Sequence, residues 1–280
     1  MTQIGQGSTG FTVVLPSVQK TVTLAWAALT DTGHRRQVNE DSLVAEPPVF
    51  AVADGMGGHS AGDVASAAVV TRLAELAGTD HLEAEAINFA LGLSVIDMAA
   101  GEGVTDLGTG TTVTGVAIGI VSGAPQWIVF NIGDSRVYQL TSGVLEQVTT
   151  DHSVVQELVD AGRITRDEAD VHPHGNIVTR AVGFHEPPVP DYRIRPLQAG
   201  MRLLICSDGL TKELTAYGIR HFLISNPRAD DAAEALLDAA LDNGGRDNVT
   251  VIVLDVLAVE DSSATEDTAA AEGSVPPELG

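Results

Sequence analysis

The segment VFAVADG, residues 49–55, sets the pattern for this chain, because a short apolar run there meets an aspartate beside a glycine. Similar patterns follow in WIVFNIGDSR at 127–136, in MRLLICSDG at 201–209 and in GGRDNVTVIVLDV at 244–256. Short β-branched apolar runs are typical of buried strands. An aspartate is therefore predicted where each strand meets a loop: Asp54, Asp134, Asp208 and Asp247.

Strand ends can converge in space, and converging carboxylates repel one another by about 1 to 4 kcal/mol per pair at roughly 4 Å. The chain has 15 Lys and Arg residues against 38 Asp and Glu residues, so few basic side chains can offset that repulsion. Divalent cations that prefer oxygen ligands are the natural counter-ions. The pattern predicts a metal site built from strand-end aspartates.

Composition favours one folded domain with tails, because 280 residues of 44% hydrophobic content can form one large core. We expect residues 1–20 to form a partly flexible extension, residues 21–258 the folded domain, and residues 259–280 a disordered acidic tail. The formal net charge of -23 argues against electrostatic binding to nucleic acid or to an anionic membrane.

Cysteine content and hydropathy indicate the compartment. Cys206 is the single cysteine and cannot form an internal disulfide, which fits a reducing cytosol. No stretch reaches the roughly 18 consecutive apolar residues of a membrane helix, and the N-terminus lacks the basic and apolar regions of a signal peptide. We therefore expect a cytoplasmic protein.

Hydrophobic periodicity predicts both strands and helices. Strands are expected at 22–29, 42–46, 49–53, 112–121, 126–132, 135–140, 144–148, 191–195, 201–206 and 249–257. Helices are expected at 62–76, 83–100, 153–162 and 229–244. Because many strands are joined by turns too short for a crossover helix, we expect an α+β protein with antiparallel sheets packed together and helices outside.

Two polar segments next to the VFAVADG strand carry further candidate chemistry. After Asp54, four glycines within eight residues allow a carbonyl or a ligand to approach the backbone closely. His59 in this segment is either a proton donor near neutral pH or a surface histidine. Upstream, the adjacent Arg35 and Arg36 either form a surface ion pair with Glu40 and Asp41, or one of the two guanidinium groups grips an oxyanion bidentately while the acids hold metal or its waters.

Seven motifs of the chain resemble, in the same order, those of the bacterial metal-dependent type-2C Ser/Thr protein phosphatases, the PPM family. They are RQVNED, VADGMGGH, GTGTT, NIGDSRVY, NIVTRAVG, LLICSDGL and GGRDNVTVIV. The resemblance covers about residues 22–257. It implies a four-layer αββα sandwich of two central antiparallel β-sheets flanked by helices, with a metal site at one edge.

The resemblance also implies metal ligands. Asp54 is similar to the carboxylate that bridges two Mg2+ or Mn2+ ions. Asp208 and Asp247 resemble further ligands of the first ion. Glu40, largely through water, and the Gly55 carbonyl resemble ligands of the second ion.

Other matched positions resemble residues that act on the substrate or on a further ion. Arg36 resembles the phosphate-binding arginine, Asp41 the acid that orients metal-bound water, and His59 the general acid for the leaving alkoxide. Asp134 resembles a residue that holds a third, weaker ion in bacterial members. Where those members often carry an acid, this chain has Lys212, which either weakens the third ion, replaces its charge, or is a solvated residue that opens a helix.

The implied function is hydrolysis of phosphoserine and phosphothreonine in proteins, by direct attack of a water or hydroxide that bridges two divalent metals. The cofactors are two or three Mn2+ or Mg2+ ions. The partners are phosphorylated Ser/Thr proteins, with Ser/Thr protein kinases acting in opposition, and the protein is expected to be a monomer. Residues 150–182 correspond to the family's flap, in which His172 and His174 either contact the substrate or form a metal pair.

Two other functions stay open from the sequence. The first is a non-catalytic phosphoprotein-binding module with the same fold. Loss of a metal-binding carboxylate would favour this function, but the expected carboxylates are all present: Glu40, Asp41, Asp54, Asp208 and Asp247. A metal-dependent hydrolase of another phosphoester is compatible with intact ligands. Comparing phosphopeptides with small phosphomonoesters would separate this last function from protein dephosphorylation.

Overall fold

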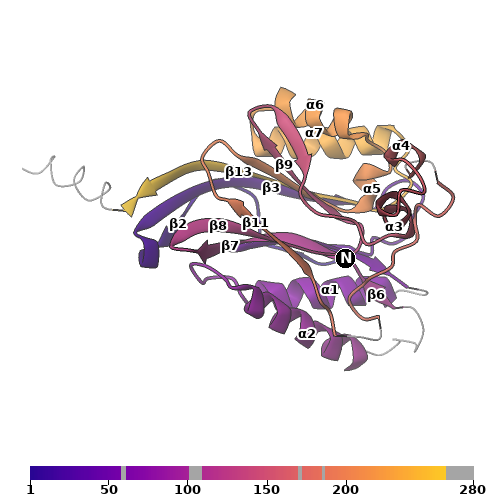
Figure 1. Ribbon diagram of the computed structural model, residues 1–280, viewed down its shortest axis with the longest axis horizontal. Coiled ribbons are helices and arrows are strands. Elements are labelled where there is room, and N and C mark those ends of the chain that lie inside the picture. The colour runs from indigo at the N-terminus through magenta and orange to yellow at the C-terminus, as the bar shows by residue number, and fades with distance from the viewer. Residues whose placement is uncertain (58–60, 101–108, 170–171, 185–186, 263–280) are drawn as a thin grey trace, which may run out of the picture.

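The computed structural model describes residues 1–57, 61–100, 109–169, 172–184 and 187–262. Within these ranges two β-sheets lie face to face, and helices cover both outer faces (Figure 1). This arrangement confirms the predicted α+β fold with its αββα layers. No helix in the described part of the chain is both long enough and apolar enough to cross a membrane.

The first sheet has the strand order β1-β4-β5-β7-β8-β11, with β6 paired to the end of β5. Its strands are β1 Gln3–Ile4, β4 Asp41–Glu46, β5 Val49–Met56, β6 Gly110–Thr111, β7 Val113–Val121, β8 Ala124–Ile132 and β11 Asp191–Pro196. All of these pairs are antiparallel except β1 with β4, which is parallel. Short turns join β4 to β5 and β7 to β8, which explains the antiparallel pairing of these two pairs.

The second sheet has the order β10-β9-β12-β13-β3-β2, with every pair antiparallel. Its strands are β2 Ser8–Leu15, β3 Lys20–Asp31, β9 Arg136–Thr141, β10 Val144–Gln147, β12 Arg202–Cys206 and β13 Val249–Asp261. Strand β2 lies in the segment expected to be an extension, yet it buries Val13 and Leu15 against the core. The first residues thus contribute to the sandwich. The tail predicted from residue 259 begins later than expected, because β13 continues to Asp261 and pairs there with β3; residues 263–280 lie outside the described residues.

Helices α1 Ala61–Ala74 and α2 Ala84–Ala100 cover the first sheet, and α6 Ala216–Ser225 and α7 Ala229–Asp242 cover the second (Figure 1). The remaining helices are short: α3 Val154–Asp160, α4 Arg166–Ala169, α5 Asp208–Thr211 and a 3-10 turn at Pro16–Val18. Helix α6 was not predicted, because glycine, aromatic and β-branched residues give its sequence a weak helix propensity. It forms because Ile219 and Leu223 pack into the core, and because Thr215 caps its first turn by accepting from the Gly218 N–H.

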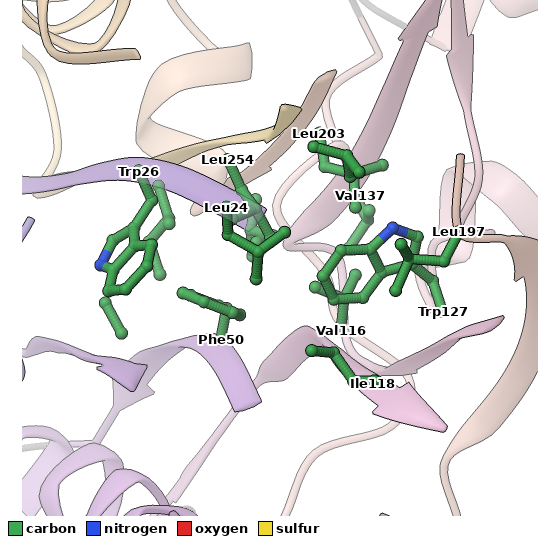
Figure 2. Close-up of a cluster of buried hydrophobic side chains, with 14 of the residues drawn as sticks. Leu24, Trp26, Phe50, Val116, Ile118, Trp127, Val137, Leu197, Leu203 and Leu254 are labelled. Carbon is green, nitrogen blue, oxygen red and sulfur yellow. The ribbon is translucent and has the colours of Figure 1, made fainter. Parts of the chain in front are cut away.

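The main core lies between the two sheets, and Figure 2 shows side chains from both sheets meeting there. Trp26 of β3 and Phe50 of β5 meet edge to face, with ring centroids 5.2 Å apart. Trp127 of β8 is fully buried nearby. Fully burying a large apolar side chain contributes about 1.5 to 3 kcal/mol to the free energy of unfolding. Packing in this layer therefore fixes the position of one sheet relative to the other, including at the strand ends.

Candidate metal centre

Strand ends from both sheets meet at one end of the sandwich, the end that carries α5 and β6 in Figure 1. In the first sheet, Asp41 at the start of β4 pairs directly with Asp54 near the end of β5. In the second sheet, Asp208 follows β12 and Asp247 precedes β13, and these two strands are neighbours. The antiparallel connections therefore bring the predicted aspartates together.

A cavity of about 270 Å³ opens between these strand ends. Its lining residues are Arg36, Glu40, Asp54, Gly55, Met56, Gly57, Thr112, Asp134, Asn176, Val178, Asp208, Lys212 and Asp247. Seven predicted site residues are among them. Asp41, which is 1% exposed, does not line the cavity. His59, the predicted general acid, lies outside the described residues.

Glu40 is held by backbone contacts at the edge of the cavity. Asn248 accepts a hydrogen bond from the Glu40 N–H at 2.8 Å, and its amide donates to the carbonyls of Thr32 and Val38 at 2.9 and 3.0 Å. The Glu40 carboxylate accepts from the backbone N–H of Gly62, at the N-terminus of α1. Burial still raises the pKa of Glu40, so its charge lacks full compensation.

Asp41 joins the two sheets. The Thr250 hydroxyl of β13 donates to Asp41 Oδ2 at 2.6 Å, while the Asp41 N–H donates to Asn39 Oδ1 at 3.0 Å. The other carboxylate oxygen, Oδ1, is buried and has no hydrogen-bond partner. A buried carboxylate oxygen without a hydrogen-bond partner is energetically costly, which indicates that a further group binds next to Asp41.

Two threonines of the GTGTT motif fix the backbone at Asp54. The Asp54 N–H donates to Thr112 Oγ1 at 3.1 Å, and the Asp54 carbonyl accepts from the Thr112 N–H at 2.8 Å and from the Thr111 hydroxyl at 2.9 Å. Thr112 Oγ1 also lies 2.8 Å from Ser135 Oγ, next to Asp134. One short segment thus positions both the β5 end and the β8–β9 turn.

The glycines after Asp54 allow two backbones to touch. A Cβ on Gly55 would lie 2.1 Å from the Gly62 carbonyl oxygen, and a Cβ on Gly62 would lie 2.7 Å from Glu40 Oε1. Both distances are too short for a side chain. Glycine is therefore required here for close approach, as the sequence indicated.

Basic side chains surround Asp247. Arg36 makes a bidentate contact with it, Nε to Oδ1 at 2.7 Å and Nη2 to Oδ2 at 3.0 Å, rather than with Glu40 or Asp41. Lys212 Nζ lies 3.0 Å from Asp247 Oδ2 and 2.5 Å from Asp208 Oδ2. Burial alone would raise the pKa of Asp247, but the Lys212 and Arg36 charges lower it overall.

Among the described residues, Asp41, Asp54 and Asp134 have no ion pair of the kind that Asp208 and Asp247 form. Burial, reinforced by the charges of Asp208 and Asp247, raises the pKa of Asp41 to about 7. Burial, followed by the charge of Asp208, raises the pKa of Asp134 to about 7. Burial and the surrounding carboxylates raise the pKa of Asp54 well above its usual range. These carboxyl groups repel one another and resist ionisation unless a cation arrives.

The donor set fits divalent cations. Within the described ranges no three Asp, Glu, His or Cys side chains already form a ligand shell. Asp208 is paired with Lys212, and Asp247 with Lys212 and Arg36. However, the buried oxygens Asp41 Oδ1 and Asp208 Oδ1 lack partners. Carboxylate and carbonyl oxygens are the ligands that hard cations such as Mg2+ and Mn2+ prefer.

The segment expected to act as a flap borders the same cavity, through Asn176 and Val178. Within this segment, the Val154 N–H at the start of α3 donates to the Ile177 carbonyl at 3.0 Å. His172 Nδ1 accepts from the His174 N–H at 3.1 Å, so one nitrogen of the suggested metal pair is already engaged. The described residues provide no ligand cluster around these two histidines.

Sequence patterns alone missed three supporting residues. Asn248 and Thr250 lie in the GGRDNVTVIV motif and Thr112 in the GTGTT motif, but the roles of all three depend on contacts with distant segments. Lys212 was noticed, but it ends α5 rather than opening a helix, and its ammonium is paired rather than solvated. Motif membership was the available signal for Asn248, Thr250 and Thr112, and the position four residues after Asp208 was the signal for Lys212.

Comparison with known proteins identifies relatives over most of the chain. The family model of protein phosphatase 2C matches residues 31–242. Serine/threonine protein phosphatase PstP of Mycobacterium tuberculosis is 43% identical over 246 residues, covering 85% of this chain but 46% of PstP. The chain thus spans about half the length of that relative. Serine/threonine phosphatase stp of Listeria monocytogenes is 36% identical over 235 residues, covering 81% of this chain and 93% of stp.

Solved structures have the same architecture. The crystal structure of M. tuberculosis PstP/Ppp superposes with a TM-score of 0.76 at 38% identity, covering 85% of this chain and 100% of that one. The catalytic domain of PstP in complex with two manganese ions gives a TM-score of 0.73 at 37% identity, covering 85% of this chain and 99% of that one.

Proposed function

The chain belongs to the protein phosphatase 2C family, and on that premise we propose that it is a metal-dependent protein serine/threonine phosphatase. Its substrates are proteins carrying phosphoserine or phosphothreonine, and its cofactors are two or three Mn2+ or Mg2+ ions. One observation carries the proposal: five carboxyl groups line one cavity, with Asp41 buried beside Asp54, and in the described residues that cavity is lined by two basic side chains, Arg36 and Lys212.

We assign the ions to the oxygen donors of the cavity. Asp54, Asp208 and Asp247 would hold the first ion. Asp54, the Gly55 carbonyl and, largely through water, Glu40 would hold the second, and Asp134 with Asp208 would hold a third. Bound divalent cations supply a nucleophilic water near neutral pH and positive charge for the phosphoryl oxygens.

The chain's own residues bind and orient the substrate. Arg36 is 48% exposed at the cavity, so its guanidinium can turn from Asp247, which it contacts bidentately here, to grip the phosphoryl oxygens. Asp41 orients the attacking water, for which its unpartnered Oδ1 is a suitable acceptor. His59 donates the proton to the departing serine or threonine oxygen.

Hydrolysis of a phosphothreonine peptide by the wild type and by Asp54→Asn, with Mn2+ and after chelation, tests the proposal. We expect turnover that requires Mn2+ and falls at least about a hundredfold in the variant, because the ions contribute several kcal/mol to catalysis. Asp97→Asn is the matched control, since Asp97 pairs with Arg72 on the helices that cover the first sheet. It should retain wild-type turnover.

Two outcomes would favour the other functions. Failure of the folded, Mn2+-loaded wild type to cleave any phosphopeptide would favour the non-catalytic binding module. Strong preference for a small phosphomonoester over every phosphopeptide would favour a different phosphoester hydrolase.

Residues 150–182 are proposed to contact the protein substrate, because Asn176 and Val178 border the cavity. Replacing Asn176 by Ala should raise KM for a phosphoprotein while leaving KM for a small phosphomonoester unchanged. Equal effects on both substrates would contradict a role in protein recognition.

We further propose that the protein acts as a cytoplasmic monomer, in opposition to Ser/Thr protein kinases. The single cysteine, Cys206, is buried, which suits a reducing compartment. Sedimentation of the purified protein tests the monomeric state, which a stable dimer would contradict. Fractionation of cells that express the protein tests the cytoplasmic location, which a membrane-bound fraction would contradict.

A further inference from the structure

Lys212 is one of two lysines in the chain, the other being Lys20. It follows the single turn of α5, and its N–H donates to the Asp208 carbonyl at 2.8 Å. Residues four apart on a helical turn lie on the same face, so the Lys212 side chain extends alongside the Asp208 carboxylate. Local structure thus directs the ammonium into the carboxylate cluster.

The ammonium occupies the space between two carboxylates. Nζ lies 2.5 Å from Asp208 Oδ2 and 3.0 Å from Asp247 Oδ2, and the Lys212 side chain is 29% exposed. The two carboxylates come from neighbouring strand ends of the second sheet. An ammonium that bridges them fills the position where a divalent cation would contact both.

An ammonium and a divalent cation cannot share these oxygens. At about 4 Å their charges would repel by several kcal/mol even at an effective dielectric constant near 20. One of the two has to leave, and the lysine is the one with a flexible four-carbon stem.

We propose that the Lys212 ammonium is a built-in counter-ion, which bridges Asp208 and Asp247 until a divalent cation displaces it. This inference rests on the proposed metal-dependent function and concerns the occupancy of the same site. The lysine weakens metal binding, because each binding event must first break its two ion pairs. It also stabilises the metal-free protein by keeping two of the clustered carboxylates paired.

The test is calorimetric titration of Mn2+ into the chelator-treated wild type, Lys212→Met and Lys20→Met. Methionine keeps most of the side-chain volume without the charge. We expect Lys212→Met to bind Mn2+ about tenfold or more tightly than the wild type. Lys20→Met should match the wild type, since Lys20 pairs with Asp261 on the surface. In thermal denaturation without metal, Lys212→Met should melt below the wild type, and Mn2+ should raise its Tm by a larger increment.

A charge-retaining variant, Lys212→Arg, covers the case in which metal-free Lys212→Met does not fold. It should bind Mn2+ within about threefold of the wild type, because its cation still competes for the carboxylates. Tighter binding by Lys212→Arg, or unchanged or weaker binding by Lys212→Met, would overturn the inference and leave the phosphatase proposal standing. Absence of Mn2+ binding to the wild type and to Lys212→Met would overturn both.

Discussion

Asp41 and Asp134 are buried and Asp54 is half-buried at the cavity, and desolvation together with neighbouring carboxylates raises the pKa of each. When folding raises the pKa of an acid, the folded protein binds more protons than the unfolded chain at pH values between the ordinary pKa, near 4, and the raised pKa. The contribution of the protonated carboxyl group to the free energy of unfolding is therefore complete below this pH range, and it falls as the pH rises through the range. For Asp41 and Asp134 the range runs from about pH 4 to about pH 7.

Replacing Asp134 by Asn should therefore stabilise the metal-free protein at high pH. At pH 8 the gain should be roughly 2 to 4 kcal/mol, because the variant no longer ionises a group whose pKa is raised to about 7. Near pH 4 the gain should vanish, since the wild-type carboxyl is then protonated. Urea denaturation of chelator-treated proteins at both pH values measures it, and a gain independent of pH would contradict the electrostatic cause.

Arg36 supports a prediction about substrate binding. Replacing it by Ala removes a bidentate phosphate ligand, so KM for a phosphopeptide should rise about tenfold or more. Arg36→Lys should recover only part of the loss, because an ammonium lacks the planar fork. Arg35→Ala, at the exposed neighbouring position, is the control and should keep its KM. An unchanged KM in Arg36→Ala would place the phosphate elsewhere.

The sequence predicted those site residues whose positions follow from the order and direction of the strands. Asp54 lies near the end of β5, and Asp208 and Asp247 flank β12 and β13, so their convergence followed from the strand pattern and the antiparallel turns. The partners of Asp41 and Lys212 were not predictable, because each is defined by contacts between segments distant in the sequence. Thr250, for example, is 209 residues from Asp41.

At the level of elements, the site depends on the contact between the end of β5 and the start of α1, where Gly55 meets Gly62. Gly55→Ala should cost about 3 kcal/mol or more and weaken Mn2+ binding, because the new Cβ would push against backbone. Gly92→Ala in α2, where a Cβ meets nothing within 4 Å, should instead stabilise by about 0.5 to 1 kcal/mol. Chemical denaturation checks both, and a neutral Gly55→Ala would show that this contact is dispensable.

Elements with strong periodicity were predicted well, and elements that form through tertiary contacts were not. Helices α1, α2 and α7 follow the predicted segments closely. Strand β2 was assigned to an extension because Gly, Ser and Thr surround it, yet it pairs with β3 and buries Leu15. Partner strands override weak local preference in such cases.

Across the whole molecule, a formal net charge of -23 acts on any charged substrate. Phosphopeptides with basic flanking residues should be attracted, and those with acidic flanks repelled. At 0.1 M salt we expect a higher kcat/KM for an arginine-flanked than for an aspartate-flanked phosphothreonine peptide. The difference should shrink at 1 M salt, where the Debye length falls from about 10 Å to about 3 Å. A preference unaffected by salt would indicate local contacts instead.

The two-sheet architecture supplies the carboxylates, with β4 and β5 contributing from one sheet and β12 and β13 from the other. The central claim is that cations neutralise this cluster, and the anomalous difference map of a crystal soaked in Mn2+ tests it most directly. We predict at least two manganese peaks in the cavity, both in contact with Asp54, with Lys212 withdrawn from Asp247. A map without a peak beside Asp54, in crystals that admit Mn2+ elsewhere, would contradict the metal-centre assignment.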